Sequence, residues 1–155
     1  MKVQRVYLDT SVIGGCLDVE YARWSKGLLV DLRLGLLKAI LSDIIAAEIE
    51  DAPLPVQEIY AELLTLQPDM IGVDEPALEL AELYQQRGIL TPKFYADGLH
   101  VALATVAEAD VMVSWNFKHI VHFDKIRLFN AVNLERGYKP LQIYSPREVA
   151  SHEAE

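Results

Sequence analysis

The sequence predicts an α/β protein, a three-layer α/β/α sandwich around a central, mostly parallel sheet of four or five strands. Short apolar segments alternate with longer segments of helical periodicity along the 155 residues, and this alternation is typical of βαβ units. The segment 111–113, Val-Met-Val, carries no polar residue, as expected of a strand buried on both faces. No repeat or long linker divides the chain, so we expect one domain over residues 1–150 and a short polar tail over 151–155.

The first part of the chain is expected to hold two strands and two helices. Residues 3–8 are rich in Val, Tyr and Leu and predict the first strand. Residues 21–37 place apolar side chains at helical spacing and predict a helix. Residues 38–41 predict the second strand, and Ser42-Asp43 is suited to cap a second helix, which must end before Pro53.

The middle of the chain continues the same alternation. Residues 56–66 are expected to be helical, and residues 70–73 form a third short strand. A further helix is predicted over 75–87. Gly88 directly follows it, and a glycine adopts the left-handed conformation that ends many helices.

The last part of the chain completes the pattern. Residues 95–107 form an alanine-rich helix, whose small side chains allow close packing on a sheet, and 111–113 is the buried strand. A helix is predicted over 126–136 and a final strand over 141–144. The segment 145–148, Ser-Pro-Arg-Glu, fits a capping box with proline at the first helical position.

The composition limits the classes of function. The net charge is −9, from 14 Lys and Arg against 23 Asp and Glu, which argues against a protein that coats nucleic acid by bulk electrostatics. It is compatible with an enzyme whose acids hold divalent cations. The single cysteine, Cys16, excludes an internal disulfide and a cysteine-rich zinc site. Without a long apolar window or a signal-like start, we expect a cytoplasmic protein that does not enter a membrane.

Polar residues occur where parallel sheets bind their ligands. Asp9 ends the first strand, and Asn116 follows the strand at 111–113. Glu48 lies in the helix after the second strand, and Asp97 lies in the first turn of the alanine-rich helix. Each residue alone is more often a turn former or a solvated helix residue. Because the carboxyl ends of parallel strands share one edge, however, their joint placement predicts a cleft that contains all four.

Four segments of the chain resemble the motifs of the PIN-domain family. VYLDTS at 6–11 is similar to the opening strand of that family, and AAEI at 46–49 to its second acidic motif. DGLHVALA at 97–104 resembles the third motif, and VSWNF at 113–117 resembles the fourth. The order and spacing cover nearly the whole chain. Within the family, the chain resembles the VapC-type toxin ribonucleases of toxin–antitoxin systems.

The resemblance implies a metal-dependent endoribonuclease that hydrolyses phosphodiester bonds of RNA. Asp9 and Asp97 would be the principal ligands of Mg²⁺ or Mn²⁺, since hard cations prefer oxygen ligands. Glu48 would also hold a metal or would orient the attacking water. Asn116, where the family more often has Asp, would assist from the rim of the site. An amide oxygen carries no negative charge, so one tightly held ion is easier to support than two.

Other residues are expected to support this site. Thr10, Ser11 and Ser114 offer hydroxyl groups that can hydrogen-bond a carboxylate or a phosphate. Lys118 and Lys125 lie in the densest basic stretch of the chain, which can contact RNA phosphates or simply be a solvated surface.

One further side chain, His100, lies three residues after Asp97 on the same helix face. It is placed to reach the site, but we expect a half-buried, hydrogen-bonded histidine there. By resemblance we also expect RNA, a small antitoxin protein and a second copy of the chain as partners.

Alternative functions remain open at this point. A PIN-like module that no longer cuts, and that binds RNA or protein instead, is favoured by Asn116. A dinucleotide-binding fold is not favoured, because Gly14-Gly15 lacks the rest of the glycine fingerprint. A haloacid-dehalogenase-like hydrolase usually has a second acid two residues after Asp9, and Ser11 occupies that position.

Overall fold

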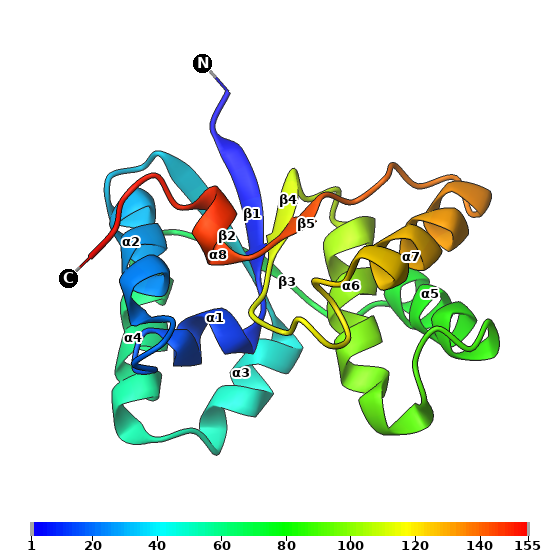
Figure 1. Cartoon of the computed structure of the whole chain (residues 1–155), viewed down its shortest axis with the longest axis horizontal. Coiled ribbons are helices and arrows are strands. Elements are labelled where there is room, and N and C mark those ends of the chain that lie inside the picture. Colours follow the sequence, from blue (N-terminus) through cyan, green and yellow to red (C-terminus); the bar gives the residue numbers. More distant parts are fainter. Residues whose placement is uncertain (1, 155) are drawn as a thin grey trace.

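A computed structural model describes residues 2–154, and its centre is a parallel sheet (Figure 1). The sheet has five strands in the order β3-β2-β1-β4-β5, and every neighbouring pair is parallel. The strands are β1 (Gln4–Leu8), β2 (Leu37–Ser42), β3 (Asp69–Ile71), β4 (Val111–Val113) and β5 (Ile143–Tyr144). The predicted sheet is therefore confirmed.

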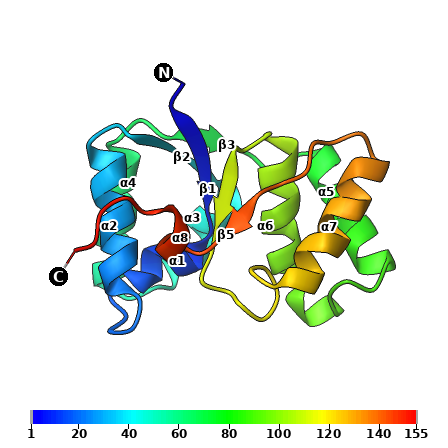
Figure 2. The same cartoon turned by 45° about the horizontal axis from the view of Figure 1, so that its top comes forward.

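Helices cover both faces of this sheet. They are α1 (Thr10–Gly15), α2 (Ala22–Arg33), α3 (Asp43–Glu50), α4 (Leu54–Leu64), α5 (Glu75–Gln86), the 3₁₀ helix η1 (Pro92–Phe94), α6 (Tyr95–Val106), α7 (Phe123–Glu135) and α8 (Pro146–Val149). The helices α2 and α4 lie together on one side, and α5, α6 and α7 lie together on the other (Figure 1, Figure 2). This is the expected α/β/α sandwich.

The core is densest around the central strand β1. Val6, Tyr7 and Leu8 of β1 are completely or almost completely buried, as is all of β4. Ala102 and Ala104 of α6 have no exposed surface. Their small side chains allow α6 to approach the sheet and α5 closely, which fixes the position of the α6 N-terminus beside the carboxyl edge of the sheet.

Two local expectations were wrong. No helix was predicted over residues 10–15, because Thr, Ser, Val and Gly are poor helix formers. The helix α1 forms there because Val12 and Ile13 are buried between α2 and α4, and tertiary packing outweighs propensity. The helix predicted over 21–37 ends at Arg33, since Gly35 adopts a left-handed φ of 74° and the chain enters β2 at Leu37.

The segment after α8 lies along α2. Ser151 donates hydrogen bonds from its backbone N and its Oγ, both at 2.7 Å, to the carboxylate of Asp31, which is 1% exposed. Ala154 N donates to the carbonyl oxygen of Arg23 at 3.0 Å. These contacts fix the C-terminal segment on the face of the sheet that carries α2. Across residues 2–154, none of the helices has the length and apolar character needed to cross a bilayer.

Candidate active site

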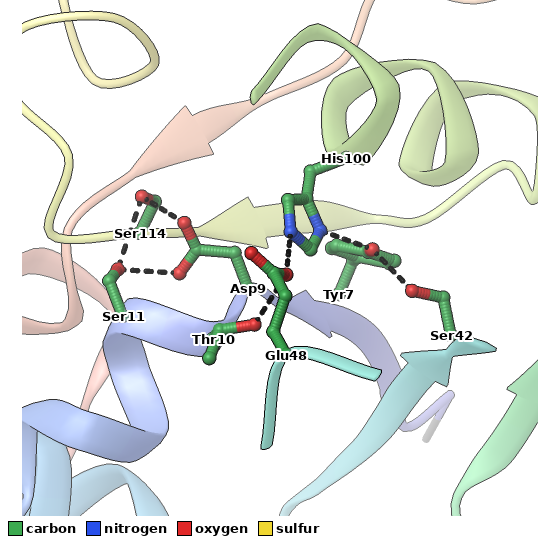
Figure 3. A network of polar contacts seen from close by, with 8 residues as sticks. All are labelled: Tyr7, Asp9, Thr10, Ser11, Ser42, Glu48, His100 and Ser114. Atoms are coloured by element: carbon green, nitrogen blue, oxygen red, sulfur yellow. Dashed lines mark hydrogen bonds and ion pairs between the residues drawn. The ribbon is translucent and has the colours of Figure 1, made fainter. Parts of the chain in front are cut away.

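The parallel register brings the ends of β1 and β4 together at the carboxyl edge of the sheet. Leu8 pairs with Val113, so the next residues, Asp9 and Ser114, emerge side by side. Asp9 is also the N-cap residue of α1. The helices α3 and α6 approach the same edge and supply Glu48 and His100 (Figure 3).

Asp9 is a buried carboxylate held between two serine hydroxyls. It is 4% exposed. Ser11 Oγ donates to its Oδ1 at 2.6 Å, and Ser114 Oγ donates to its Oδ2 at 2.6 Å (Figure 3). Burial raises the pKa of Asp9, although the His100 ring and both serine hydroxyls act in the opposite direction. Within residues 2–154, Asp9 forms no ion pair with a lysine or arginine.

The same two serines attach the loop after β4 to the start of α1. Ser11 Oγ accepts a hydrogen bond from Trp115 N at 2.9 Å, and Ser114 Oγ accepts one from Asn116 N at 2.9 Å. Each hydroxyl therefore accepts from a backbone N–H and donates its own proton to Asp9. Since a hydroxyl has one proton, these contacts fix its direction toward the carboxylate.

Glu48 is held by a second set of hydrogen bonds. Thr10 Oγ1 donates to Glu48 Oε1 at 2.8 Å, and His100 Nε2 lies 2.8 Å from the same oxygen. Burial acts to raise the pKa of Glu48. The hydrogen bond with His100, the charge of His100 and the hydrogen bond from Thr10 together hold that pKa below its ordinary value. Glu48 is therefore ionised at neutral pH.

Asp97 lies in the first turn of α6, half-buried near the other acids. Burial raises the pKa of Asp97, and the negative charge of Glu48 raises it further. The charges of His119 and His100 and the amide of Asn116 act to lower it. Asn116 Oδ1 accepts a hydrogen bond from His119 N at 2.9 Å. Asn116 and Glu48 therefore lie close enough to Asp97 to change its pKa.

The comparisons with known proteins agree with this geometry at the level of the fold. No family model and no curated relative matches the sequence. One similar solved structure is VapBC2 from Rickettsia felis, bound to a DNA fragment from the promoter. A chain of that structure superposes with a TM-score of 0.55 at 16% identity, and the match covers 91% of this chain and 98% of that chain. A toxin–antitoxin complex from Klebsiella pneumoniae gives 0.53 at 16% identity, over 74% and 88%.

The chain has a PIN-like fold. The resemblance seen in the four sequence segments is therefore supported by the structure. At 16% identity the likeness concerns the fold.

The acids at the carboxyl edge of the sheet suit a hard cation by their chemistry. Asp9, Glu48 and Asp97 offer carboxylate oxygens, and among residues 2–154 the basic partner of Glu48 is a histidine alone. In residues 2–154, however, no three Asp, Glu, His or Cys side chains are already arranged around a common metal position. The donor set therefore fits Mg²⁺ or Mn²⁺ in kind, and a cation would have to draw the carboxylates closer together.

The two lysines proposed for RNA contact have different surroundings. Lys118 is exposed. Lys125 is partly buried, and its Nζ donates a hydrogen bond to the carbonyl oxygen of Ile89. Between them in the sequence, His119 stacks against Phe94 with ring centroids 3.8 Å apart. Lys118 is thus the freer of the two cations.

Sequence reasoning missed the residues behind Glu48. His100 was expected to be half-buried and hydrogen-bonded, and it is in fact buried and in contact with Glu48. Its other ring nitrogen contacts Tyr7, which in turn contacts Ser42. The available signal was the hydroxyl of Tyr7 between the apolar residues Val6 and Leu8 in the buried half of β1, because a buried tyrosine requires a hydrogen-bond partner.

Proposed function

We propose that this chain is a Mg²⁺- or Mn²⁺-dependent endoribonuclease and acts as the toxin of a toxin–antitoxin pair. The observation that carries the proposal is the cluster of Asp9, Glu48 and Asp97 at the carboxyl edge of a PIN-like sheet, without a lysine or arginine to compensate it among residues 2–154. Carboxylates collected without a partner cation are costly in a metal-free protein, and a divalent ion would remove that cost.

In this proposal Asp9, Asp97 and Glu48 hold the cation. A bound Mg²⁺ or Mn²⁺ would lower the pKa of a water molecule and polarise the scissile phosphate. Ser11 and Ser114 orient the Asp9 carboxylate through hydrogen bonds of 2.6 Å each.

The remaining polar groups of the cleft act on water and on the RNA backbone. Glu48 stays ionised at neutral pH and is therefore able to orient the attacking water and accept its proton. Asn116 assists from the rim through its amide group. Lys118 contacts a phosphate on the RNA, while Lys125 supports the loop at Ile89.

The partners follow from the same proposal. One similar solved structure is a toxin–antitoxin complex, and the other is VapBC2 bound to promoter DNA, which supports a small antitoxin protein as partner of this chain. RNA is the proposed substrate, a homodimer the proposed assembly, and the cytoplasm the proposed location.

A second candidate function rests on Asn116. With an amide at this position, the site has three acids rather than four. A PIN-like module that binds RNA or protein without cutting does not need a fourth acid. The two functions differ in metal binding, because an inert module does not require an affinity for Mn²⁺ that depends on Asp9 and Asp97.

The test is cleavage of a mixed RNA pool by the purified chain over a range of Mn²⁺ concentrations, with EDTA as the metal-free reference. Wild type is expected to cut with Mn²⁺ and not with EDTA. Asp9→Asn is expected to be inactive, and Asp110→Asn, an acid at the opposite end of the sheet, is the matched control that should cut normally. An inactive wild type whose melting temperature does not respond to Mn²⁺ would favour the binding module.

A further inference from the structure

A chain of three hydrogen bonds leads from the interior of the sheet to Glu48, and a fourth reaches Glu48 from Thr10. Ser42 Oγ lies 2.8 Å from Tyr7 Oη, and Tyr7 Oη lies 2.7 Å from His100 Nδ1. His100 Nε2 lies 2.8 Å from Glu48 Oε1, which also accepts from Thr10 Oγ1 at 2.8 Å (Figure 3). Ser42, Tyr7 and His100 are buried, at 0%, 0% and 3% exposure. The three residues behind Glu48 are therefore shielded from solvent.

The direction of these hydrogen bonds follows from the chemistry of their ends. An ionised Glu48 only accepts hydrogen bonds, so His100 Nε2 must carry a proton. On the other side of the ring, Tyr7 Oη lies 2.7 Å from Nδ1, and this hydroxyl can donate to a neutral ring or accept from a charged one. Ser42 Oγ, 2.8 Å from Tyr7 Oη, completes the hydrogen bonding in either case. Every buried polar atom is satisfied in this arrangement, and no buried side-chain N or O in residues 2–154 lacks a partner.

The arrangement restricts a side chain that is otherwise free to move. The Glu48 side chain is 42% exposed, and an exposed glutamate samples several rotamers, which costs free energy when it is fixed. Two donors hold its Oε1, while its Oε2 accepts no hydrogen bond within residues 2–154. Fixing Oε1 by protein donors leaves Oε2 as the oxygen available to a cation or to its bound water.

We propose that His100 is a positioning residue for Glu48, and that Tyr7 holds the His100 ring in the orientation that presents Nε2 to Glu48. The proposal deepens the proposed nuclease function and rests on it. A neighbouring hydrogen-bond partner that orients a ligand typically changes metal affinity or activity by about 10- to 100-fold when it is removed. Neither residue touches the substrate in this proposal, so the effect acts through Glu48.

The first test observes the ring directly in the metal-free protein. The ¹⁵N chemical shifts of His100 distinguish the two neutral tautomers, and wild type is expected to show Nε2 as the protonated nitrogen. Tyr7→Phe removes the hydrogen-bond partner of Nδ1, so the ring is expected to lose its fixed orientation and, with it, the protected Nε2–H signal that the contact with Glu48 gives in wild type. Tyr84→Phe is the matched control, because Tyr84 is equally buried and donates to Asn133 in a separate polar group. Loss of the Nε2–H form in Tyr84→Phe as well, or its persistence in Tyr7→Phe, would overturn the proposal.

The second test measures Mn²⁺ affinity by calorimetry. In His100→Leu, an apolar side chain of moderate size replaces the ring and provides no donor to Glu48. We expect Mn²⁺ to bind this variant about 10- to 100-fold more weakly. His100→Gln offers an amide donor near the position of Nε2 and is expected to recover part of the affinity. Equal Mn²⁺ affinity in wild type and in folded His100→Leu would overturn the positioning role.

These outcomes separate the positioning role from the nuclease function itself. If wild type binds Mn²⁺ and cuts RNA but His100→Leu does both equally well, the nuclease function stands and the role of His100 is wrong. If wild type neither binds Mn²⁺ nor cuts RNA, the nuclease function is wrong, and the tautomer experiment still decides whether Tyr7 fixes the His100 ring. In the positive case, His100→Leu is expected to lower kcat more than it raises KM for RNA.

Discussion

The acids at the two ends of the sheet have different hydrogen-bond and ion-pair partners. At the carboxyl edge, Asp9 is held by two serine hydroxyls and Glu48 by a threonine and a histidine. At the amino edge, Asp69 accepts a hydrogen bond from Arg5 Nε at 2.8 Å and forms an ion pair with Lys38 Nζ at 3.2 Å. Both clusters are assembled by the parallel register, yet only one contains permanent positive charge.

The electrostatic consequences are opposite in sign. The hydrogen bond from Arg5 lowers the pKa of Asp69. Burial opposes it, and the hydrogen bond from Lys38 and the charges of both cations add to the lowering. Burial raises the pKa of Asp9 and of Asp97. The acid at the amino edge is thus stabilised as an anion, while the two aspartates at the carboxyl edge are destabilised as anions.

This difference indicates what each end contributes. Compensated acids at the start of the strands join β1, β2 and β3 and serve the fold. Uncompensated buried acids raise the free energy of the folded protein, and acids whose pKa is raised by burial mark candidate functional sites. The contrast predicts that mutations at the two ends change different measured quantities.

The largest expected effect is that of Asp97→Asn on RNA cleavage. It removes a proposed ligand charge while it keeps nearly the same shape, so the loss should exceed the roughly 10- to 100-fold typical of a residue that only orients a ligand. Without metal, the urea midpoint is expected to rise, because a neutral amide avoids the cost of a half-buried anion near Glu48. Cleavage rates and urea unfolding measure the two quantities.

The control for Asp97→Asn is Asp69→Asn at the amino edge. It is expected to lower the urea midpoint and to leave cleavage unchanged, since it breaks the contacts with Arg5 and Lys38. The contrast between the two ends fails if Asp97→Asn cuts like wild type, or if both variants change stability in the same direction.

The next effect is that of Asn116→Asp on metal binding. A fourth carboxylate in the cleft should tighten Mn²⁺ binding by roughly tenfold, or about 1.4 kcal/mol. Without metal it should lower the urea midpoint, because the introduced carboxylate would replace an amide that now acts to lower the pKa of Asp97. Calorimetric titration with Mn²⁺ decides the first point. If only Asn116→Asp cuts RNA, wild type is a binding module.

The contrast between the two ends also explains how far the sequence could predict the site. Asp9 and Asn116 were recognisable because each follows a short apolar strand, and the order of strands and helices made a common edge a reasonable expectation. The fold was predictable for the same reason, since local patterns set the strand–helix alternation.

The contacts that hold the acids were not predictable from local patterns. Tyr7 and His100 are 93 positions apart, and Trp115 N and Ser11 Oγ belong to residues 104 positions apart. Such pairs depend on the three-dimensional packing of α6 and the β4 loop against β1. The helix α1 was missed for a related reason, because burial of Val12 and Ile13 outweighs the low helix propensity of the two glycines that follow them.

A smaller effect is expected in the pH dependence of stability at the amino edge. The folded pKa of Asp69 lies below its ordinary value of 3.8, so its contribution is present above that value and is lost as the pH falls through the folded pKa. Asp69→Asn should therefore cost about 1 kcal/mol at neutral pH and less at about pH 3. Urea unfolding at both pH values measures the difference. A cost that does not change with pH would show that the ion pairs with Arg5 and Lys38 are not its source.

The smallest expected effect concerns RNA affinity and compares three lysines. Binding is measured in the Asp97→Asn background, so that RNA is not cut. Lys118→Ala should reduce the slope of log affinity against log salt by about 0.7, the value for one phosphate contact on a single strand. Lys139→Ala is the control at the amino edge, where Lys139 forms an ion pair with Glu108, and it should leave the slope unchanged. Lys125→Ala should instead lower the free energy of unfolding by about 1 kcal/mol, because it removes the donor to Ile89 O. If Lys139→Ala flattens the slope as much as Lys118→Ala, RNA is held by general attraction to scattered lysines, and the carboxyl edge has no special role in binding it.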